Sequence, residues 1–300
     1  MGEPIRYYDR QRKILATEQV YGGRWLRLAY ETAPGRLAVS LLIKRAVCSR
    51  WYGRRMSHPA SAARVVPFIS EYGLDPTEFA KRPEEFASFN EFFCRALQPG
   101  ARPVAAAENP RVAVLPADGR HLAFPDVDAA AGFYVKGAKF TLAELLGDAA
   151  LAGEFAGGGM LISRLCPVDY HRFHFPVGGT PSASHLINGW LYSVNPIALR
   201  RNIRYLVENK RELTLLDTPA FGRVALLEIG ATNVGTVRQS YTPGSQVAKG
   251  GEKGWFEFGG SCVVTVFARG RIRFDADLVA QSAECIETYA KMGERLGESV

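Results

Sequence analysis

The chain has 300 residues, of which 47% are hydrophobic, and its formal net charge is +7. It is long enough to bury a large core in one domain or two. Its five cysteines are scattered and odd in number, which argues for a reducing compartment and against a disulfide framework. No apolar stretch approaches the roughly 20 residues that cross a bilayer, and no secretory signal is recognisable, so we expect neither a membrane-spanning nor a secreted protein.

The excess positive charge lies near the N-terminus. Residues 1–64 contain 13 Lys or Arg against 4 Asp or Glu, whereas the rest of the chain is slightly acidic. Apolar and aromatic residues are interleaved with these Lys and Arg residues, a pattern that suits helices lying in the headgroup zone of an anionic membrane. A solvated basic face is the structural alternative, and no nucleic-acid-binding module is present. The interleaved residues are Trp25, Leu26, Leu28, Tyr30, Leu37–Ile43, Trp51 and Tyr52.

Up to about Leu97 the chain has a helical pattern interrupted by proline and glycine. Helices are predicted over Ser61–Tyr72 and Asp75–Phe86, where Asp75 can cap the helix and Pro76 suits its first turn. We therefore expect residues 1–97 to form a helical, basic, membrane-associating region.

From Val112 onward the chain is rich in β-prone runs bounded by glycine and proline turns. Short helical patterns interrupt or close this part at Leu142–Leu146, Ile197–Val207 and Leu278–Met292. The order of elements indicates an α+β fold, in which the helical region precedes a mainly antiparallel β-rich core over residues 98–300. The predicted strands are Val112–Leu115, Gly159–Leu165, His171–Phe175, Ser184–Tyr192, Arg223–Ile229, Val234–Val237, Cys262–Phe267 and Arg271–Phe274.

One serine lies at the start of a strongly β-prone run. Ser261 follows Gly259 and Gly260 and precedes the apolar segment Cys262–Phe267. Because glycines have no Cβ, another side chain can approach the Gly260 carbonyl, and the backbone can take conformations closed to other residues. A serine placed in this way can attack its own preceding peptide bond, although a turn or bulge is the commoner meaning of Gly-Gly-Ser.

Two other segments contain the residue types that activate a serine. Asp118 lies in Leu-Pro-Ala-Asp-Gly-Arg, and His171 and His174 lie in Asp-Tyr-His-Arg-Phe-His. A histidine held by a carboxylate can take the proton of Ser261, so these segments supply a complete set. A simple Asp-Gly turn is the structural alternative for Asp118. The histidine pair lacks further ligands at metal-binding spacing, so no metal is expected.

In their order along the chain, these segments and several others resemble the phosphatidylserine decarboxylase family of pyruvoyl-dependent, self-cleaving enzymes. The resemblance covers most of the chain from about Phe89 onward. Any one segment could arise by chance, but the ordered set is specific. The segments that carry it are Phe89–Phe93, Pro116–Gly119, Asp169–His174, Leu191–Pro196, Gly230–Gly235 and Gly254–Val264.

The resemblance implies a proenzyme that cuts itself between Gly260 and Ser261. By analogy with the family, Asp118 orients His174, and His174 deprotonates Ser261. The hydroxyl attacks the Gly260 carbonyl to form an ester, and elimination followed by hydrolysis and loss of ammonia converts the serine into a pyruvoyl group. This group is the covalent cofactor that the resemblance implies, and pyridoxal phosphate is not expected.

The resemblance also implies the reaction. A pyruvoyl ketone forms a Schiff base with phosphatidylserine and accepts the electron pair left when CO2 departs, which gives phosphatidylethanolamine. His171 is expected to protonate the resulting carbanion. The large chain (1–260) and the small chain (261–300) are expected to stay associated as a peripheral enzyme of phospholipid biosynthesis at the cytoplasmic face of the cell membrane. Family members are often dimers.

One departure from the family and two alternative functions remain. Most members have Thr or Ser after the reactive serine, whereas this chain has Cys262, which is of similar size but hydrogen-bonds more weakly. A Ser-His-Asp hydrolase could use the same residues, but the Gly-x-Ser-x-Gly pattern is absent around Ser261. A lipoyl or biotinyl carrier hairpin needs a lysine at its tip, where this chain has a serine.

Overall fold

The computed structural model describes residues 4–232, 236–259 and 261–300. Within them, the largest sheet has ten strands in the order β2-β1-β15-β4-β5-β13-β10-β9-β7, and β8 also pairs with β9. Neighbouring strands run antiparallel except β1 and β15, which are parallel. The strands are β1 (Arg6–Asp9), β2 (Ile14–Thr17), β4 (Gly119–Phe124), β5 (Gly159–Leu165), β7 (Thr180–Pro181), β8 (His185–Ile187), β9 (Arg211–Thr218), β10 (Gly222–Gly230), β13 (Ser261–Phe267) and β15 (Glu287–Ala290).

Two small sheets accompany the large one. One has the order β11-β12-β6 and the other β14-β16-β3. The β6–β12 pair places the histidine segment beside the strand that leads toward Ser261. The strands are β3 (Val112–Val114), β6 (Arg172–His174), β11 (Val237–Gln239), β12 (Glu252–Phe256), β14 (Arg273–Phe274) and β16 (Arg295–Glu298).

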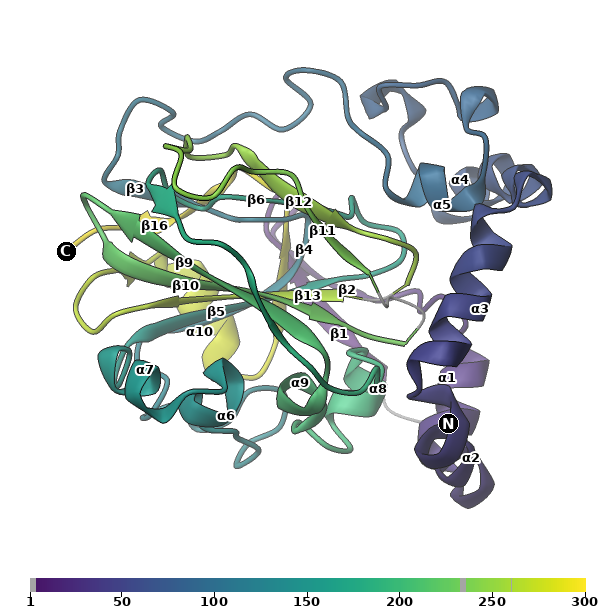
Figure 1. Cartoon of the computed structure of the whole chain (residues 1–300), viewed down its shortest axis with the longest axis horizontal. Coiled ribbons are helices and arrows are strands. Elements are labelled where there is room, and N and C mark those ends of the chain that lie inside the picture. Colours follow the sequence, from purple (N-terminus) through teal and green to yellow (C-terminus); the bar gives the residue numbers. More distant parts are fainter. Residues whose placement is uncertain (1–3, 233–235, 260) are drawn as a thin grey trace.

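Helices form two groups around the sheets (Figure 1). The N-terminal group lies along one side of the molecule, and a second group covers a face of the large sheet. The first comprises α1 (Gly23–Glu31), α2 (Ala33–Ala38), the π-helical turn η1 (Val39–Ile43), α3 (Ala46–Ser57), η2 (Pro59–Arg64), α4 (Val65–Tyr72), η3 (Pro76–Glu78), η4 (Pro83–Glu85) and α5 (Phe89–Phe93). The second comprises α6 (Leu142–Leu146), α7 (Ala149–Glu154), α8 (Pro196–Leu199) and α9 (Tyr205–Glu208), whereas α10 (Ala276–Ala283) packs on the opposite face through Leu278.

Strand β13 lies near the middle of the large sheet and is buried along its whole length. Its Val264 and Val266 belong to one apolar cluster, whereas Phe267 packs into another on the opposite side. A strand covered on both faces needs apolar side chains in both directions, which explains the uninterrupted apolar run after Ser261. The sheet therefore fixes the position of this serine rigidly at one end of a buried strand.

Several predicted elements are confirmed. Strand β5 and helix α6 have the predicted bounds, and β3, β6, β10 and β13 lie within one or two residues of theirs. Thr141 caps the N-terminus of helix α6. Its hydroxyl accepts a hydrogen bond from the Glu144 N–H, and the Glu144 carboxylate accepts one from the Thr141 N–H. Asp75 caps η3 as expected, with Pro76 in the first turn. The antiparallel α+β architecture is likewise confirmed.

Other predictions were wrong. The N-terminal region is not helical throughout, because β1 and β2 join the large sheet before the first helix begins at Gly23. The predicted helix Leu278–Met292 ends at Ala283, because Cys285 has a φ of 56° and the chain then forms β15. Asp75–Phe86 forms two short 3-10 turns. Ile197–Val207 is divided between α8 and α9.

Several described strands were missed, and some predicted strands are shorter than expected. The strands that were not predicted are β1, β2, β4, β7, β9, β12, β15 and β16. The predicted strands Ser184–Tyr192 and Arg271–Phe274 shrink to β8 and β14. Val234 and Gly235 lie outside the described residues, and Val237 begins β11. None of the described helices combines the length and apolar character that crossing a bilayer requires.

Candidate active site

Ser261 opens β13 and pairs with Gly230 of β10 and Leu165 of β5. Its side chain is fully buried, and its Oγ has no hydrogen-bond partner among the described residues. A buried hydroxyl without a partner costs roughly 1–3 kcal/mol, so natural proteins retain such groups mainly where they serve a function. Gly260, the predicted partner in cleavage, lies outside the described residues. The structure thus presents a serine hydroxyl that no structural hydrogen bond holds.

His171 precedes β6 and is buried. Its Nδ1 lies 3.0 Å from the Asp169 carbonyl oxygen, which can only accept, so Nδ1 carries the proton. Its Nε2 is buried and has no hydrogen-bond partner within the described part of the chain. Burial lowers the pKa of His171 to about 3, and the backbone of Asp169 and of Gly259 opposes this only in part. A neutral imidazole with a free Nε2 therefore lies close to Gly259.

The motif Phe89–Phe93 supplies the support for this histidine. Ser88 caps α5 by accepting a hydrogen bond from the Glu91 N–H. The ring of Phe93 lies against the His171 imidazole with centroids 3.7 Å apart. Asn90 accepts a hydrogen bond of 2.8 Å from the Phe258 N–H, two residues before Gly260. The sequence showed this motif, but not that it holds both the histidine and the segment before Ser261.

His174 ends β6 and has both ring nitrogens engaged. Nδ1 lies 3.0 Å from the Gly250 carbonyl oxygen and therefore donates to it. Nε2 lies 3.3 Å from the Tyr170 hydroxyl, which donates to it. Burial lowers the pKa of His174. The basic nitrogen of the ring therefore already accepts a hydrogen bond from a neighbouring tyrosine.

Asp118 lies just before β4 and has different partners from those expected. Its carboxylate accepts hydrogen bonds from Arg102 at 2.7–3.0 Å and from the Met292 N–H at 2.8 Å. Asp118 raises the pKa of His174, but its effect is smaller than that of burial, which lowers this pKa, and than that of the Gly250 backbone, which raises it. The predicted hydrogen bond between Asp118 and His174 is therefore not formed in the described structure, and nothing in the sequence marked Arg102 as the partner.

A buried cluster of charges underlies the same region. The Arg164 Nη2 lies 2.6 Å from a Glu18 carboxylate oxygen and 2.5 Å from one of Glu287. The Arg120 Nη1 lies 2.6 Å from an Asp169 carboxylate oxygen. Burial tends to raise the pKa of Glu18, but the guanidinium groups of Arg164 and Arg120 lower it to about 2. The cluster joins the N-terminal segment, β5 and β15, and sequence pattern could not have predicted these pairings.

A cavity of about 810 Å³ extends from the N-terminal helices to this site. Leu165, Phe258 and Gly259 line its inner end, and the charged side chains of Glu18 and Arg164 lie there too. The hydroxyl of Tyr30 on α1 accepts a hydrogen bond of 2.7 Å from the Ser193 N–H, which fixes the helices to the core. Apolar residues of the helical group that line the cavity include Trp25, Leu26, Leu28, Ala29, Ala38 and Ile43. The cavity can accommodate a molecule with a long apolar part and a polar end.

Comparison with known proteins agrees with the sequence pattern. Residues 89–298 match the family model described as phosphatidylserine decarboxylase. A phosphatidylserine decarboxylase proenzyme of Fusobacterium nucleatum is 43% identical over 98% of this chain and 98% of its own length. Proenzymes of the same name from Chlamydia muridarum and Desulfitobacterium hafniense are 44% and 40% identical, over 97% and 98% of this chain and 96% and 98% of their own lengths. The chain therefore belongs to the phosphatidylserine decarboxylase family.

Proposed function

We propose that this protein is a phosphatidylserine decarboxylase made as a proenzyme, which cuts itself between Gly260 and Ser261 and then converts phosphatidylserine to phosphatidylethanolamine. The observation that carries the proposal is the buried Ser261 hydroxyl, which has no hydrogen-bond partner among the described residues and lies near the inner end of an 810 Å³ cavity. The direct test is release of CO2 from carboxyl-labelled phosphatidylserine by the purified protein. Absence of release from cleaved, folded protein would contradict the proposal.

In maturation, the chain's own residues make and break the bonds. The Ser261 Oγ attacks the Gly260 carbonyl carbon as a base takes its proton, and the bond from that carbon to the Ser261 nitrogen breaks to leave an ester. Removal of the Ser261 α-hydrogen expels the Gly260 carboxylate, and water then replaces the nitrogen, which leaves as ammonia. The resulting pyruvoyl group supplies a ketone that binds the substrate amine and withdraws the electron pair left by CO2.

The residues around Ser261 suit such a group. The Oγ makes no hydrogen bond with a described residue that would have to be broken before attack. His171 is buried and packs against the Phe93 ring, which holds the imidazole in place. Among the described residues, no group of three or more His, Cys, Asp or Glu side chains is placed to hold a metal ion.

We assign the two histidines to different steps. His174 is the base that takes the Ser261 proton, and Tyr170, hydrogen-bonded to its Nε2, has to release that nitrogen first. His171 delivers the proton that replaces CO2, since its Nε2 lies near Gly259 and has no hydrogen-bond partner in the described ranges. Because Nδ1 holds its only proton and the ring is neutral, Nε2 has to gain a proton after cleavage opens the site.

The variant His174→Ala is expected to remain as one uncut chain, because no base then activates the serine. His171→Ala is expected to cleave normally but to lose roughly a hundredfold or more in turnover, since general acid catalysis typically contributes that much. Denaturing gels and labelled CO2 release measure the two effects. His185→Ala, an exposed histidine on β8, is the matched control and should change neither. Normal cleavage in His174→Ala, or normal turnover in His171→Ala, would contradict the assignment.

We further propose that the N-terminal helices lie on the cytoplasmic face of the membrane. Several of their large apolar side chains are exposed, among them Trp25 at 75% and Trp51 at 63%. Arginines surround them, and the 810 Å³ cavity is lined by the same helices. Such a face can enter the headgroup zone while cations contact anionic lipid. A lipid could then enter the cavity without leaving the membrane.

The variant Trp25→Ser/Trp51→Ser is expected to bind vesicles of phosphatidylcholine and phosphatidylglycerol about tenfold more weakly or worse, because two aromatic side chains that would enter the membrane no longer contribute. Co-sedimentation measures the effect. The control variant Val135→Ser/Leu186→Ser instead removes exposed apolar side chains from the surface of the β-rich part of the chain, and it should bind vesicles normally. Equal loss in both variants would contradict this orientation.

A further inference from the structure

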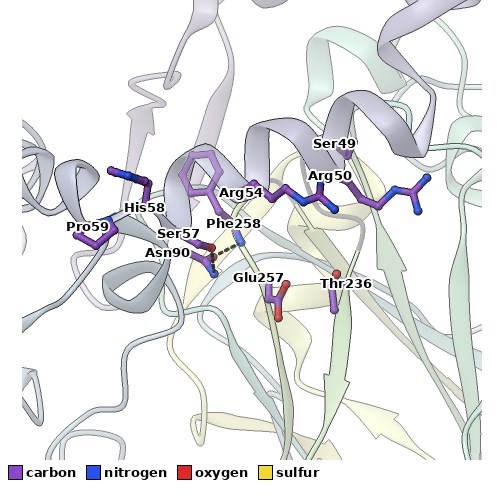
Figure 2. Close-up of a pocket in the computed structure, with 11 residues that line it drawn as sticks. Ser49, Arg50, Arg54, Ser57, His58, Pro59, Asn90, Thr236, Glu257 and Phe258 are labelled. Atoms are coloured by element: carbon purple, nitrogen blue, oxygen red, sulfur yellow. Dashed lines mark hydrogen bonds between the residues drawn. The ribbon is translucent and has the colours of Figure 1, made fainter.

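A second pocket of about 480 Å³ lies on the other side of Phe258 (Figure 2). Helix α3 and Asn90 form one wall, and Thr236, Glu257 and Phe258 form the other. Among the described residues, Phe258 is the one that lines both this pocket and the 810 Å³ cavity. The pocket is therefore a separate space that shares one wall with the candidate active site.

Two arginines give this pocket its charge. Arg50 and Arg54 are four residues apart on α3, so they project from the same side of the helix, and Figure 2 shows both on the side toward Thr236 and Glu257. Neither forms an ion pair or hydrogen bond with another residue in the described ranges, whereas Glu257 is paired with Arg238 at 3.0 Å. Within the described part of the chain, the pocket thus holds two guanidinium groups that have no ion-pair partner.

The chemistry of the lining favours a phosphate. A guanidinium group presents a planar fork of donors that matches phosphate oxygens. The Ser57 hydroxyl, which accepts a hydrogen bond of 3.2 Å from the Asn90 side chain, lines the same pocket and can donate as well. A phosphodiester would therefore find two cations and a hydroxyl in one concave site.

The neighbouring surface indicates where that phosphate comes from. On the same helix, Val47 and Trp51 are 65% and 63% exposed. Helix α3 contains no acidic residue, and Arg45 precedes it. A helix with exposed apolar side chains next to arginines suits the boundary between headgroups and acyl chains, where phosphates of membrane lipids lie.

We propose that this pocket binds the phosphate of an anionic membrane phospholipid, in addition to the substrate that enters the larger cavity. The acyl chains of this lipid remain in the membrane beside Val47 and Trp51, and its phosphate lies between Arg50 and Arg54. Asn90 lines the pocket and accepts a hydrogen bond of 2.8 Å from the N–H of Phe258, which lines both cavities. The bound lipid therefore contacts the wall of the active-site cavity. The site goes beyond the decarboxylase reaction, which needs no second lipid.

The test is calorimetric titration with dihexanoyl-phosphatidylglycerol, kept below the concentration at which it forms micelles. This lipid lacks an amine, and as a monomer it presents no charged surface that would attract the protein generally. The full chain carries Ser261→Ala, so neither cleavage nor turnover contributes heat and the outcome does not depend on the proposed activity. Arg50→Gln/Arg54→Gln is compared with Arg24→Gln/Arg55→Gln, which removes the same charge from exposed arginines outside the pocket.

The pocket variant is expected to bind at least about tenfold more weakly, while the control variant binds as the parent does. The single variants Arg50→Gln and Arg54→Gln should each lose part of the affinity, and they decide the question if the double variant does not fold. Equal affinity in all proteins, or equal loss in the control variant, would overturn the proposal. Displacement of the lipid by inorganic phosphate at comparable concentration would show a site for small anions and overturn the lipid assignment.

Discussion

Ser261→Ala is expected to leave the protein as one uncut chain without decarboxylase activity. Removal of the Oγ removes the nucleophile of the cleavage and, with it, the precursor of the pyruvoyl group. The fold should persist, because this Oγ is buried and makes no hydrogen bond with a described residue, so its loss removes no stabilising bond. Denaturing gels, intact mass and labelled CO2 release measure the three consequences.

Cys262→Ser is the matched control for this experiment. Cys262 is the next residue on β13, it is fully buried, and its side chain belongs to an apolar cluster. Serine is close to cysteine in size and leaves the Ser261 hydroxyl in place, so the variant is expected to cleave as completely as the parent. Normal cleavage in Ser261→Ala, or loss of cleavage in Cys262→Ser with Ser261 intact, would contradict the proposed role of the serine.

Glu287→Ala is expected to destabilise the protein by about 3–5 kcal/mol, because removal of one partner leaves a buried charge only partly compensated. Arg164 is 2% exposed and has carboxylates of Glu287 and Glu18 as its partners within the cluster. Urea unfolding of the uncut Ser261→Ala protein measures the change, because a single chain keeps the transition simple. The ion pair between Arg164 and Glu287 links residues 1–260 to residues 261–300, so it would also hold the two chains together after cleavage.

Glu154→Ala is the matched control for the ion pair. Glu154 and Arg223 lie 3.1 Å apart, but their side chains are 50% and 44% exposed. An exposed pair of this kind contributes about 0–1 kcal/mol, since water screens it in both states. Similar free energies of unfolding for Glu287→Ala and Glu154→Ala would contradict the proposed contribution of the buried cluster.

The sequence predicted the position of Ser261 better than its surroundings. The apolar run after Ser261 has one simple explanation, a strand buried on both faces, and β13 is that strand. Strand β15 was mistaken for the end of a helix, because the residues of Glu287–Ala290 occur in helices as well as in strands. Its pairing with β1 and β4 in the folded protein makes this segment a strand. Short strands at sheet edges, such as β1 and β2, give a similarly weak pattern.

The sequence proposed residue types for the site but could not give their hydrogen bonds. Order along the chain and family resemblance proposed Asp118, His171, His174 and Ser261, which lie in or next to the ends of β4, β6 and β13. Which carboxylate meets which base depends on side chains distant in sequence. Arg102 donates hydrogen bonds to the carboxylate of Asp118, and only the three-dimensional structure could show this pairing. The two cavities are equally products of packing between the helices and the core.

The most direct test of the central claim is the intact mass of freshly purified wild-type protein, measured under denaturing conditions and repeated after reduction with borohydride. The account predicts two chains, of which the smaller covers residues 261–300, is lighter than the serine-terminated peptide by one ammonia, and gains two hydrogens when its ketone is reduced. A single continuous chain that still releases CO2 from phosphatidylserine, or a small chain that begins with an ordinary serine in active protein, would contradict it.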